Sequence, residues 1–98
     1  MAVKLGILAL LEAKPGKGDD LADFLRSGRE LAVREEGTVT WYAFKVGDST
    51  YGIFDTFDSE EARQAHLNGE IPKALAQVGS ELLASDPDIR LVEILAVK

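Results

Sequence analysis

Two residues in the middle of the chain are of types that carry out acid–base chemistry. His66 is the only histidine in the sequence, and it is the one side chain expected to titrate near neutral pH. Asp55 lies within the largely apolar run 53–57, where an unpaired carboxylate is costly to bury. The partners that the sequence offers for Asp55 are His66 and Tyr42. We therefore take Asp55 and His66 as the candidate catalytic residues.

A structural role is the alternative for each of these residues. His66 could act as a general acid or base, or donate a hydrogen bond to a bound carbonyl group. It could equally be a helix residue that is bonded to Asp55 or to the backbone. Asp55 could have a raised pKa in a pocket, or it could make a structural hydrogen bond. The sequence leaves both alternatives open.

Aromatic residues crowd the segment from 41 to 57. Some of them could line a cavity for a flat apolar ligand, although most aromatic residues of hairpins simply pack the core. We take five of them as candidate substrate-binding residues: Trp41, Tyr42, Phe44, Tyr51 and Phe57.

Several kinds of site have no counterpart in the sequence. There is no cysteine, no phosphate-binding glycine loop and no nucleophile elbow, and one histidine does not make a multi-histidine metal site. We therefore expect no metal and no cofactor. The net charge of −6 and the scattered basic residues argue against nucleic acid as a partner. No apolar run reaches the roughly 20 residues that cross a bilayer, so we expect a cytoplasmic protein without a membrane partner.

The periodicity of apolar residues predicts the elements that must position these side chains. In order they are a strand, a helix, two strands, two helices and a strand, which is the βαββαβ order of a ferredoxin-like α+β fold. We expect one domain, 1–98, with a four-stranded antiparallel sheet and helices on one face. The expected strands are 3–13, 38–46, 50–57 and 89–97; the expected helices are 19–36, a short one from Ser59 to Asn68, and 71–82.

The segment Gly47–Ser49 is typical of a hairpin loop between the second and third strands. A two-residue turn at 48–49 would pair Val46 with Tyr51 and Tyr42 with Asp55. A loop with an odd number of residues would change this assignment. The two-residue turn predicts one face with Tyr42, Phe44, Ile53, Asp55 and Phe57, and another with Trp41, Ala43, Phe54 and Thr56.

The second face of the predicted sheet needs a cover. Helices can cover only one face, yet the first and last strands are apolar on both faces. A large exposed apolar surface usually marks an interface. We expect a homodimer formed through the open sheet face, although a different partner protein would fit the sequence equally well.

The segment 51–67 resembles the antibiotic biosynthesis monooxygenase domain family. The resemblance rests on a strand followed by Asp55-x-Phe57-x-Ser59-x-Glu61-x-x-x-x-His66-Leu67. It implies a dimeric α+β barrel, in which two ferredoxin-like sheets pack face to face and each protomer has a ligand cavity between its sheet and helices.

The resemblance also implies an activity. Members of the family oxidise polycyclic phenols to quinones with molecular oxygen and use no flavin, haem or metal. His66 with Asp55 would then assist proton transfer, while Trp41 or Tyr42 would stack on the ring. Our leading hypothesis is a cofactor-independent monooxygenase of a small aromatic or quinone-like molecule. The alternatives are an isomerase, cyclase or decarboxylase of a small ring compound, and a non-catalytic binding or interaction module.

Overall fold

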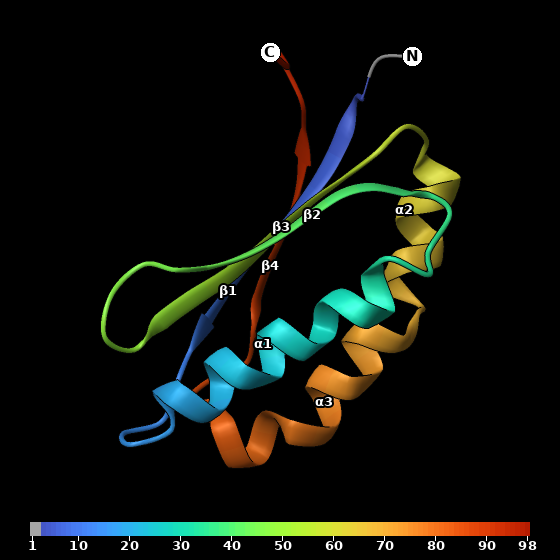
Figure 1. Ribbon diagram of the computed structural model, residues 1–98. Coiled ribbons are helices and arrows are strands. Elements are labelled where there is room, and N and C mark those ends of the chain that lie inside the picture. Colours follow the sequence, from blue (N-terminus) through green and yellow to red (C-terminus); the bar gives the residue numbers. More distant parts are fainter. Residues whose placement is uncertain (1–2) are drawn as a thin grey trace.

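The elements follow one another in the order that the sequence predicts (Figure 1). The structure is a computed structural model in which residues 3–98 are described. The bounds of the strands and helices are β1 Leu5–Glu12, α1 Gly18–Ala32, β2 Thr38–Lys45, β3 Thr50–Phe57, α2 Glu60–Leu67, α3 Glu70–Leu82 and β4 Asp88–Glu93.

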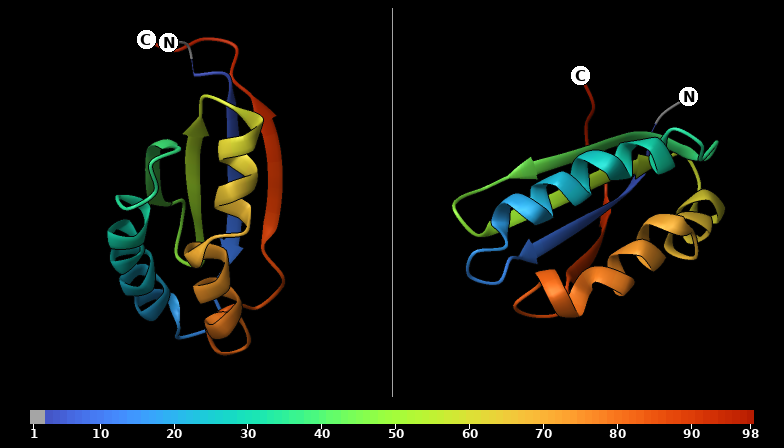
Figure 2. Two further views of the ribbon diagram at one scale, coloured as in Figure 1. Left: turned by 90° about the vertical axis from the view of Figure 1, so that its right-hand side faces the viewer. Right: turned by 60° about the horizontal axis from the view of Figure 1, so that its bottom comes forward.

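The four strands form one antiparallel sheet in the order β2-β3-β1-β4. β1 lies in the interior of the sheet and pairs with β3 on one side and with β4 on the other. Figure 2 shows the helices on one face of the sheet, with no element on the opposite face. The prediction of a ferredoxin-like α+β fold is therefore confirmed.

The core lies between the sheet and the helices. Alternate residues of β1, namely Ile7, Ala9 and Leu11, are buried on the helix-covered face, as the period of two in a strand requires. α1 contributes residues spaced four, seven and eleven apart, which lie on one side of a helix. The buried residues of α1 are Leu21, Leu25, Gly28 and Ala32, and those of α3 are Ile71, Leu75 and Leu82.

The helix α1 ends four residues earlier than the sequence predicts. After Ala32 the chain closes two tight turns, in which the amide of Arg34 donates to the carbonyl of Leu31 and that of Glu35 to that of Ala32. Such bonds over three residues satisfy carbonyl groups at a helix end. Glu35 consequently lies in a loop that reaches α2 instead of on the last turn of a helix (Figure 1).

The hairpin between β2 and β3 has a three-residue loop. The amide of Val46 donates to the carbonyl of Thr50 at 2.8 Å, so residues 47–49 form the loop. The predicted two-residue turn was wrong. Glu12, at the end of β1, accepts hydrogen bonds from the hydroxyls of Ser49 and Thr50 at 2.6 and 2.7 Å, and this holds the loop in its register.

The change of register exchanges the side chains of β2 between the two faces. Trp41 is the partner of Asp55 and lies on the helix-covered face, whereas Tyr42 is the partner of Phe54 and lies on the open face with Phe44. The predicted grouping of Tyr42 and Phe44 with Asp55 was therefore wrong by one residue.

The last strand is shorter than predicted. β4 ends at Glu93, and the amide of Ile94 donates to the carbonyl of Lys4 at 2.8 Å. Beyond this bond Leu95 and Val97 are exposed. The predicted strand to residue 97 was therefore wrong in its last four positions. None of the helices within residues 3–98 has the length and apolar character needed to cross a bilayer.

The loop that carries Glu35 depends on a glycine. A Cβ atom at Gly37 would lie 2.7 Å from the Cβ atom of Ala62 and 3.3 Å from its Cα atom, so the loop and α2 would have to separate. We predict that Gly37→Ala lowers the free energy of unfolding by about 1 to 3 kcal/mol through this overpacking. Urea unfolding measures the effect. Gly47→Ala is the control, because nothing lies within 4 Å of its added Cβ. Equal stability of the two variants would contradict the prediction.

Candidate functional site

A small cavity lies between the sheet and the helices α2 and α3. Its volume is about 110 Å³. An apolar cavity of about 150 Å³ accepts benzene, so this smaller one has room for at most one six-membered ring. The lining is apolar except for two residues, Asp55 and His66. The other lining residues are Ile7, Ala9, Ile53, Leu67, Ile71, Pro72, Leu75 and Ile89.

Asp55 is a buried carboxylate without an aligned hydrogen bond. Its exposed fraction is 1%, and it lies in β3 between Ile7 of β1 and Trp41 of β2. Neither carboxylate oxygen accepts an aligned hydrogen bond from residues 3–98. The Nε2 atom of His66 lies 3.0 Å from Oδ2, and this contact is an ion pair when the imidazole is protonated. A carboxylate in such surroundings is stabilised chiefly by the charge of its neighbour.

His66 lies between two carboxylates. Its Nδ1 atom is 2.6 Å from Oε1 of Glu35, and the same oxygen accepts a hydrogen bond from the hydroxyl of Thr38 at 2.7 Å. The ring of Phe57 lies 5.3 Å from the imidazole, centroid to centroid, at an interplanar angle of 48°. These contacts fix the imidazole in one position, with one nitrogen toward the cavity and the other toward the loop.

The pKa of His66 is raised above its ordinary value of 6.5. Burial by itself lowers the pKa, but the close contact with Asp55 and then the hydrogen bond to Glu35, together with the negative charges of both carboxylates, outweigh it. The imidazolium form of His66 therefore persists to a higher pH than it does in a free histidine.

Arg63 fixes the helix that carries His66. This buried residue lies one turn before His66, and its Nη1 atom donates to the carbonyls of Gly6 and Val92, both at 3.2 Å. Its Nε atom donates to Glu60 at 3.2 Å. α2 is thereby attached to two strands of the sheet, and this attachment sets the distance between His66 and β3.

The structure brings Asp55 and His66 together and separates Tyr42 from both. The correct register places Tyr42 on the opposite face of the sheet, so it is not a partner of Asp55. Sequence reasoning missed Glu35, which is 31 positions from His66 and was expected on the last turn of a helix. Glu35, followed by Glu36 in the sequence, carries no signal of its own, because glutamate is usually a solvent-exposed residue.

The five aromatic candidates do not line the cavity that Asp55 and His66 line. Tyr51 and Phe57 are buried in the core, and Trp41 packs against it from β2. Tyr42 and Phe44 lie on the open face. Among the five, only Phe57 has a ring contact with a residue of the site, namely His66. The walls of this cavity are aliphatic, and the substrate-binding role of the five aromatic residues stays a prediction.

A larger groove adjoins the cavity. It has a volume of about 690 Å³ and runs between α3 and the segment before β4. The groove and the cavity share Pro72, Leu75 and Ile89 as lining residues. A ligand that is larger than one ring could therefore extend from the cavity into the groove.

The raised pKa of His66 predicts how stability depends on pH. A group whose pKa is higher in the folded state contributes stability below its unfolded pKa of about 6.5, and this is lost as the pH rises through the folded pKa. The stability that His66→Asn removes should therefore be largest near pH 6 and smaller near pH 9. Urea unfolding of both proteins across this range tests it. Gln64→Asn, on the exposed side of α2, should keep the wild-type pH dependence. If the free energy of unfolding of the wild type and that of His66→Asn differ more at high pH than at low pH, the raised pKa of His66 is contradicted.

Comparison with solved structures finds relatives that span nearly the whole chain. The crystal structure of a protein of unknown function from Nitrosomonas europaea is 52% identical, with a TM-score of 0.96, and the match covers 98% of this chain and 93% of that one. No protein-family model matches this sequence. No curated protein matches it either.

More distant structures share the fold. A protein from Nitrosomonas europaea described as a "putative antibiotic biosynthesis monooxygenase" is 12% identical, with a TM-score of 0.82 over 97% of this chain and 93% of that one. One from Caulobacter crescentus with the same description is 16% identical, with a TM-score of 0.81 over 96% and 92%. The chain belongs to the family of the Nitrosomonas europaea protein of unknown function, and its fold is that of the antibiotic biosynthesis monooxygenases that its sequence resembles.

Proposed function

We propose that this protein is a cofactor-independent monooxygenase of a small hydroxylated aromatic compound, with Asp55 as the base that takes the proton of the hydroxyl group. The observation that carries the proposal is a carboxylate at 1% exposure whose oxygens accept no aligned hydrogen bond from residues 3–98 and which lines an apolar cavity. A ligand hydroxyl group would supply the missing donor.

The charges around His66 support a role for Asp55 beyond folding. One carboxylate is enough to neutralise a buried imidazolium, and Glu35 already binds Nδ1. Asp55 adds a second negative charge, which is costly in apolar surroundings. A residue that the fold does not need, at a cavity, is the kind of residue that function retains.

The reaction balances without a reductant. In the oxidation of a phenol to a quinone that the resemblance implies, the hydroxyl group becomes one carbonyl and a ring C–H becomes the other, one atom of dioxygen enters the product and the other leaves as water. The substrate supplies all four electrons. The protein's part is to remove a proton, hold the electron-rich ring and exclude water, and the aliphatic walls around Asp55 suit the last two tasks.

The size of the cavity limits the number of rings that the substrate can have. A volume of about 110 Å³ accepts at most one ring, and the adjoining groove would receive a second ring or an apolar substituent. The stacking role expected for Trp41 or Tyr42 is absent from this proposal, because neither lines the cavity. The ring would pack between aliphatic side chains such as Ile53 and Ile71.

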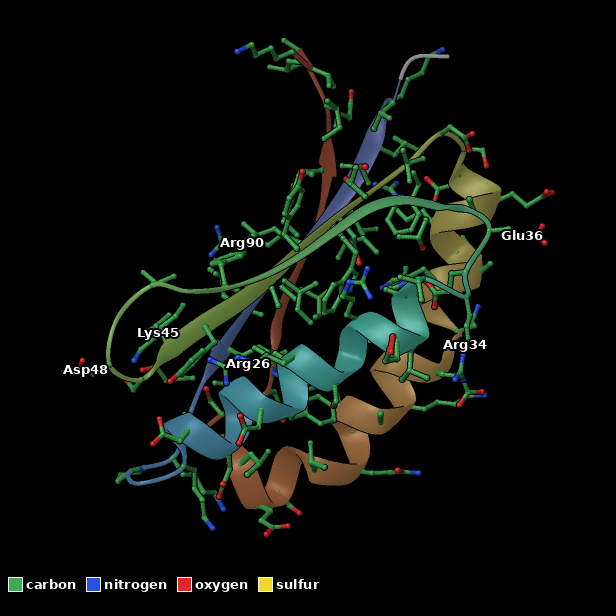
Figure 3. All side chains as sticks on the ribbon, in the orientation of Figure 1. Arg26, Arg34, Glu36, Lys45, Asp48 and Arg90 are labelled. Atoms are coloured by element: carbon green, nitrogen blue, oxygen red, sulfur yellow. The ribbon has the colours of Figure 1, made fainter. Side chains whose placement is uncertain are left out.

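A second copy of the chain is proposed to cover the open face of the sheet. The helix-free face presents a row of apolar side chains across all four strands. Tyr42 is the most exposed of the six residues named at the end of this paragraph, with an exposed fraction of 58%. Arg90, at the edge of this face, is paired with Asp88 and marks a polar border (Figure 3). The apolar residues of the face are Leu8, Leu10, Tyr42, Phe44, Phe54 and Val92.

Oxygen uptake tests the catalytic proposal. We expect purified protein to consume oxygen with hydroxylated one- and two-ring aromatics in the presence of a metal chelator. Asp55→Asn and His66→Gln should lower the rate by about 100-fold or more, as loss of a general base does. Gln64→Ala on the same helix should retain the wild-type rate.

Controls separate lost chemistry from lost folding. In Asp55→Asn the charge of the His66 imidazolium is still balanced by Glu35. The free energy of unfolding of this variant should therefore stay within about 1 kcal/mol of the wild type. Absence of uptake with every compound would contradict the monooxygenase. Exchange of ring hydrogens for deuterium without oxygen uptake would instead support an isomerase. The absence of both reactions would support a binding module.

The dimer has its own test. Tyr42→Asp places a charge within the proposed interface, on the edge strand β2, so light scattering should report a monomer at concentrations where the wild type is a dimer. Val33→Asp is the matched control, because Val33 is similarly exposed, at 61%, but follows α1 away from the open face. A monomeric wild type, or identical behaviour of the two variants, would contradict a dimer through this face.

A further inference from the structure

His66 separates two hollows of the molecule. One is the apolar cavity that Asp55 lines. The other is a surface notch of about 160 Å³ between the loop after α1 and the helix α2. Of the described residues, His66 alone lines both. The remaining residues of the notch are Glu35, Glu36, Gly37, Thr38, Ala62 and Ala65.

The two carboxylates at the imidazole differ in their access to solvent. Asp55, 3.0 Å from Nε2, is 1% exposed. Glu35, 2.6 Å from Nδ1, has a side chain that is 21% exposed and lines the notch. The chain of contacts from Asp55 through His66 to Glu35 therefore begins in the interior and ends at the surface.

Glycines make room for this arrangement. A Cβ atom at Gly69 would lie 3.0 Å from Oε2 of Glu35, and one at Gly37 would press on Ala62. The acidic groups at His66 are Asp55 from β3 and Glu35 from the loop. β1 and α3 present only apolar residues to the cavity, and the guanidinium of Arg63 on α2 is bound to Glu60 and to backbone carbonyls. No group in the described residues competes with Glu35 for Nδ1.

We propose that Glu35 is a positioning residue for His66 and the point at which protons pass between the buried Asp55 and solvent. This inference rests on the proposed function, because it gives the proton taken by Asp55 a route out of the cavity.

The steps conserve protons and involve no oxidation. At a pH above the folded pKa of His66, the imidazole is neutral and carries its hydrogen on Nδ1. Asp55 then takes the proton of the ligand hydroxyl and passes it to Nε2 of His66. The imidazolium then gives its Nδ1 proton to Oε1 of Glu35, and Glu35 gives it to water in the notch. One proton enters and one leaves. His66 now carries its hydrogen on Nε2, and the return of one proton along the same path restores the starting tautomer.

The single histidine makes the test direct. In protein labelled with ¹⁵N at histidine, every imidazole signal belongs to His66. We compare the wild type with Glu35→Gln, which keeps the shape of the side chain but neither the charge nor the basic oxygen. Glu36→Gln is the matched control. It removes the same charge from the same notch, but Glu36 is exposed and points away from the molecule beside α2 (Figure 3).

We expect Glu35→Gln to lower the pKa of His66 and to slow exchange of its ring N–H with water by about tenfold or more, because the basic oxygen that accepts the proton is gone. Glu36→Gln should leave both quantities at their wild-type values. If Glu35→Gln and Glu36→Gln titrate alike, Glu35 does not position His66. If the pKa falls but exchange stays as fast, the proton leaves by another route. Either result overturns the proposal.

Turnover supplies an independent readout. With a substrate from the oxygen-uptake panel, Glu35→Gln should lower kcat and leave KM unchanged, and added formate should restore part of kcat by acting as the missing base. An unchanged kcat overturns the proposal. If the wild type turns over none of the compounds, the monooxygenase fails on its own, since the measurement on the ligand-free protein needs no substrate.

Discussion

The burial of one carboxylate, Asp55, imposes the requirements that the rest of the structure meets. A negative charge between apolar strands needs a positive neighbour, and His66 is the residue that supplies it. Glu35, on the other side of the ring, helps to keep the buried imidazole protonated to a higher pH. The position of α2 then follows, because Arg63 attaches this helix to β1 and β4 at the place where His66 reaches β3.

The sheet separates two roles by the direction in which its side chains point. On the face covered by helices, β3 presents Asp55 to the cavity and Phe57 to His66. On the other face, the neighbouring positions Phe54 and Thr56 lie with Tyr42 and with no helix above them. Since side chains alternate along a strand, a slip of one residue would exchange the two surfaces. The register of β2 on β3 is therefore as important to the site as the identity of its residues.

The fold and one pair of the site follow from the sequence, and the physical reasons are clear. The apolar run of β1 and the helical spacing in α1 are long signals, so the order of elements is predicted correctly. The pairing of Asp55 with His66 is predictable because a buried carboxylate requires a partner, and few are offered. The hairpin register is not, because loops of two and of three residues both suit Gly47–Ser49, and the choice is made by Glu12 from a distant strand. Glu35 escapes prediction for a similar reason, since only tertiary packing distinguishes it from an ordinary helix-end glutamate.

Because α1 ends early, the charge of His66 depends on whether the loop that carries Glu35 is closed. The turns after Ala32 contain few buried apolar side chains, and segments of this kind are the first to open in a folded protein. When this loop opens, Glu35 leaves Nδ1, and the imidazole loses part of what holds its proton. Proton binding at His66 and closure of the loop are therefore thermodynamically linked. A small segment at the surface can set the charge of a group in the interior without any movement of the sheet.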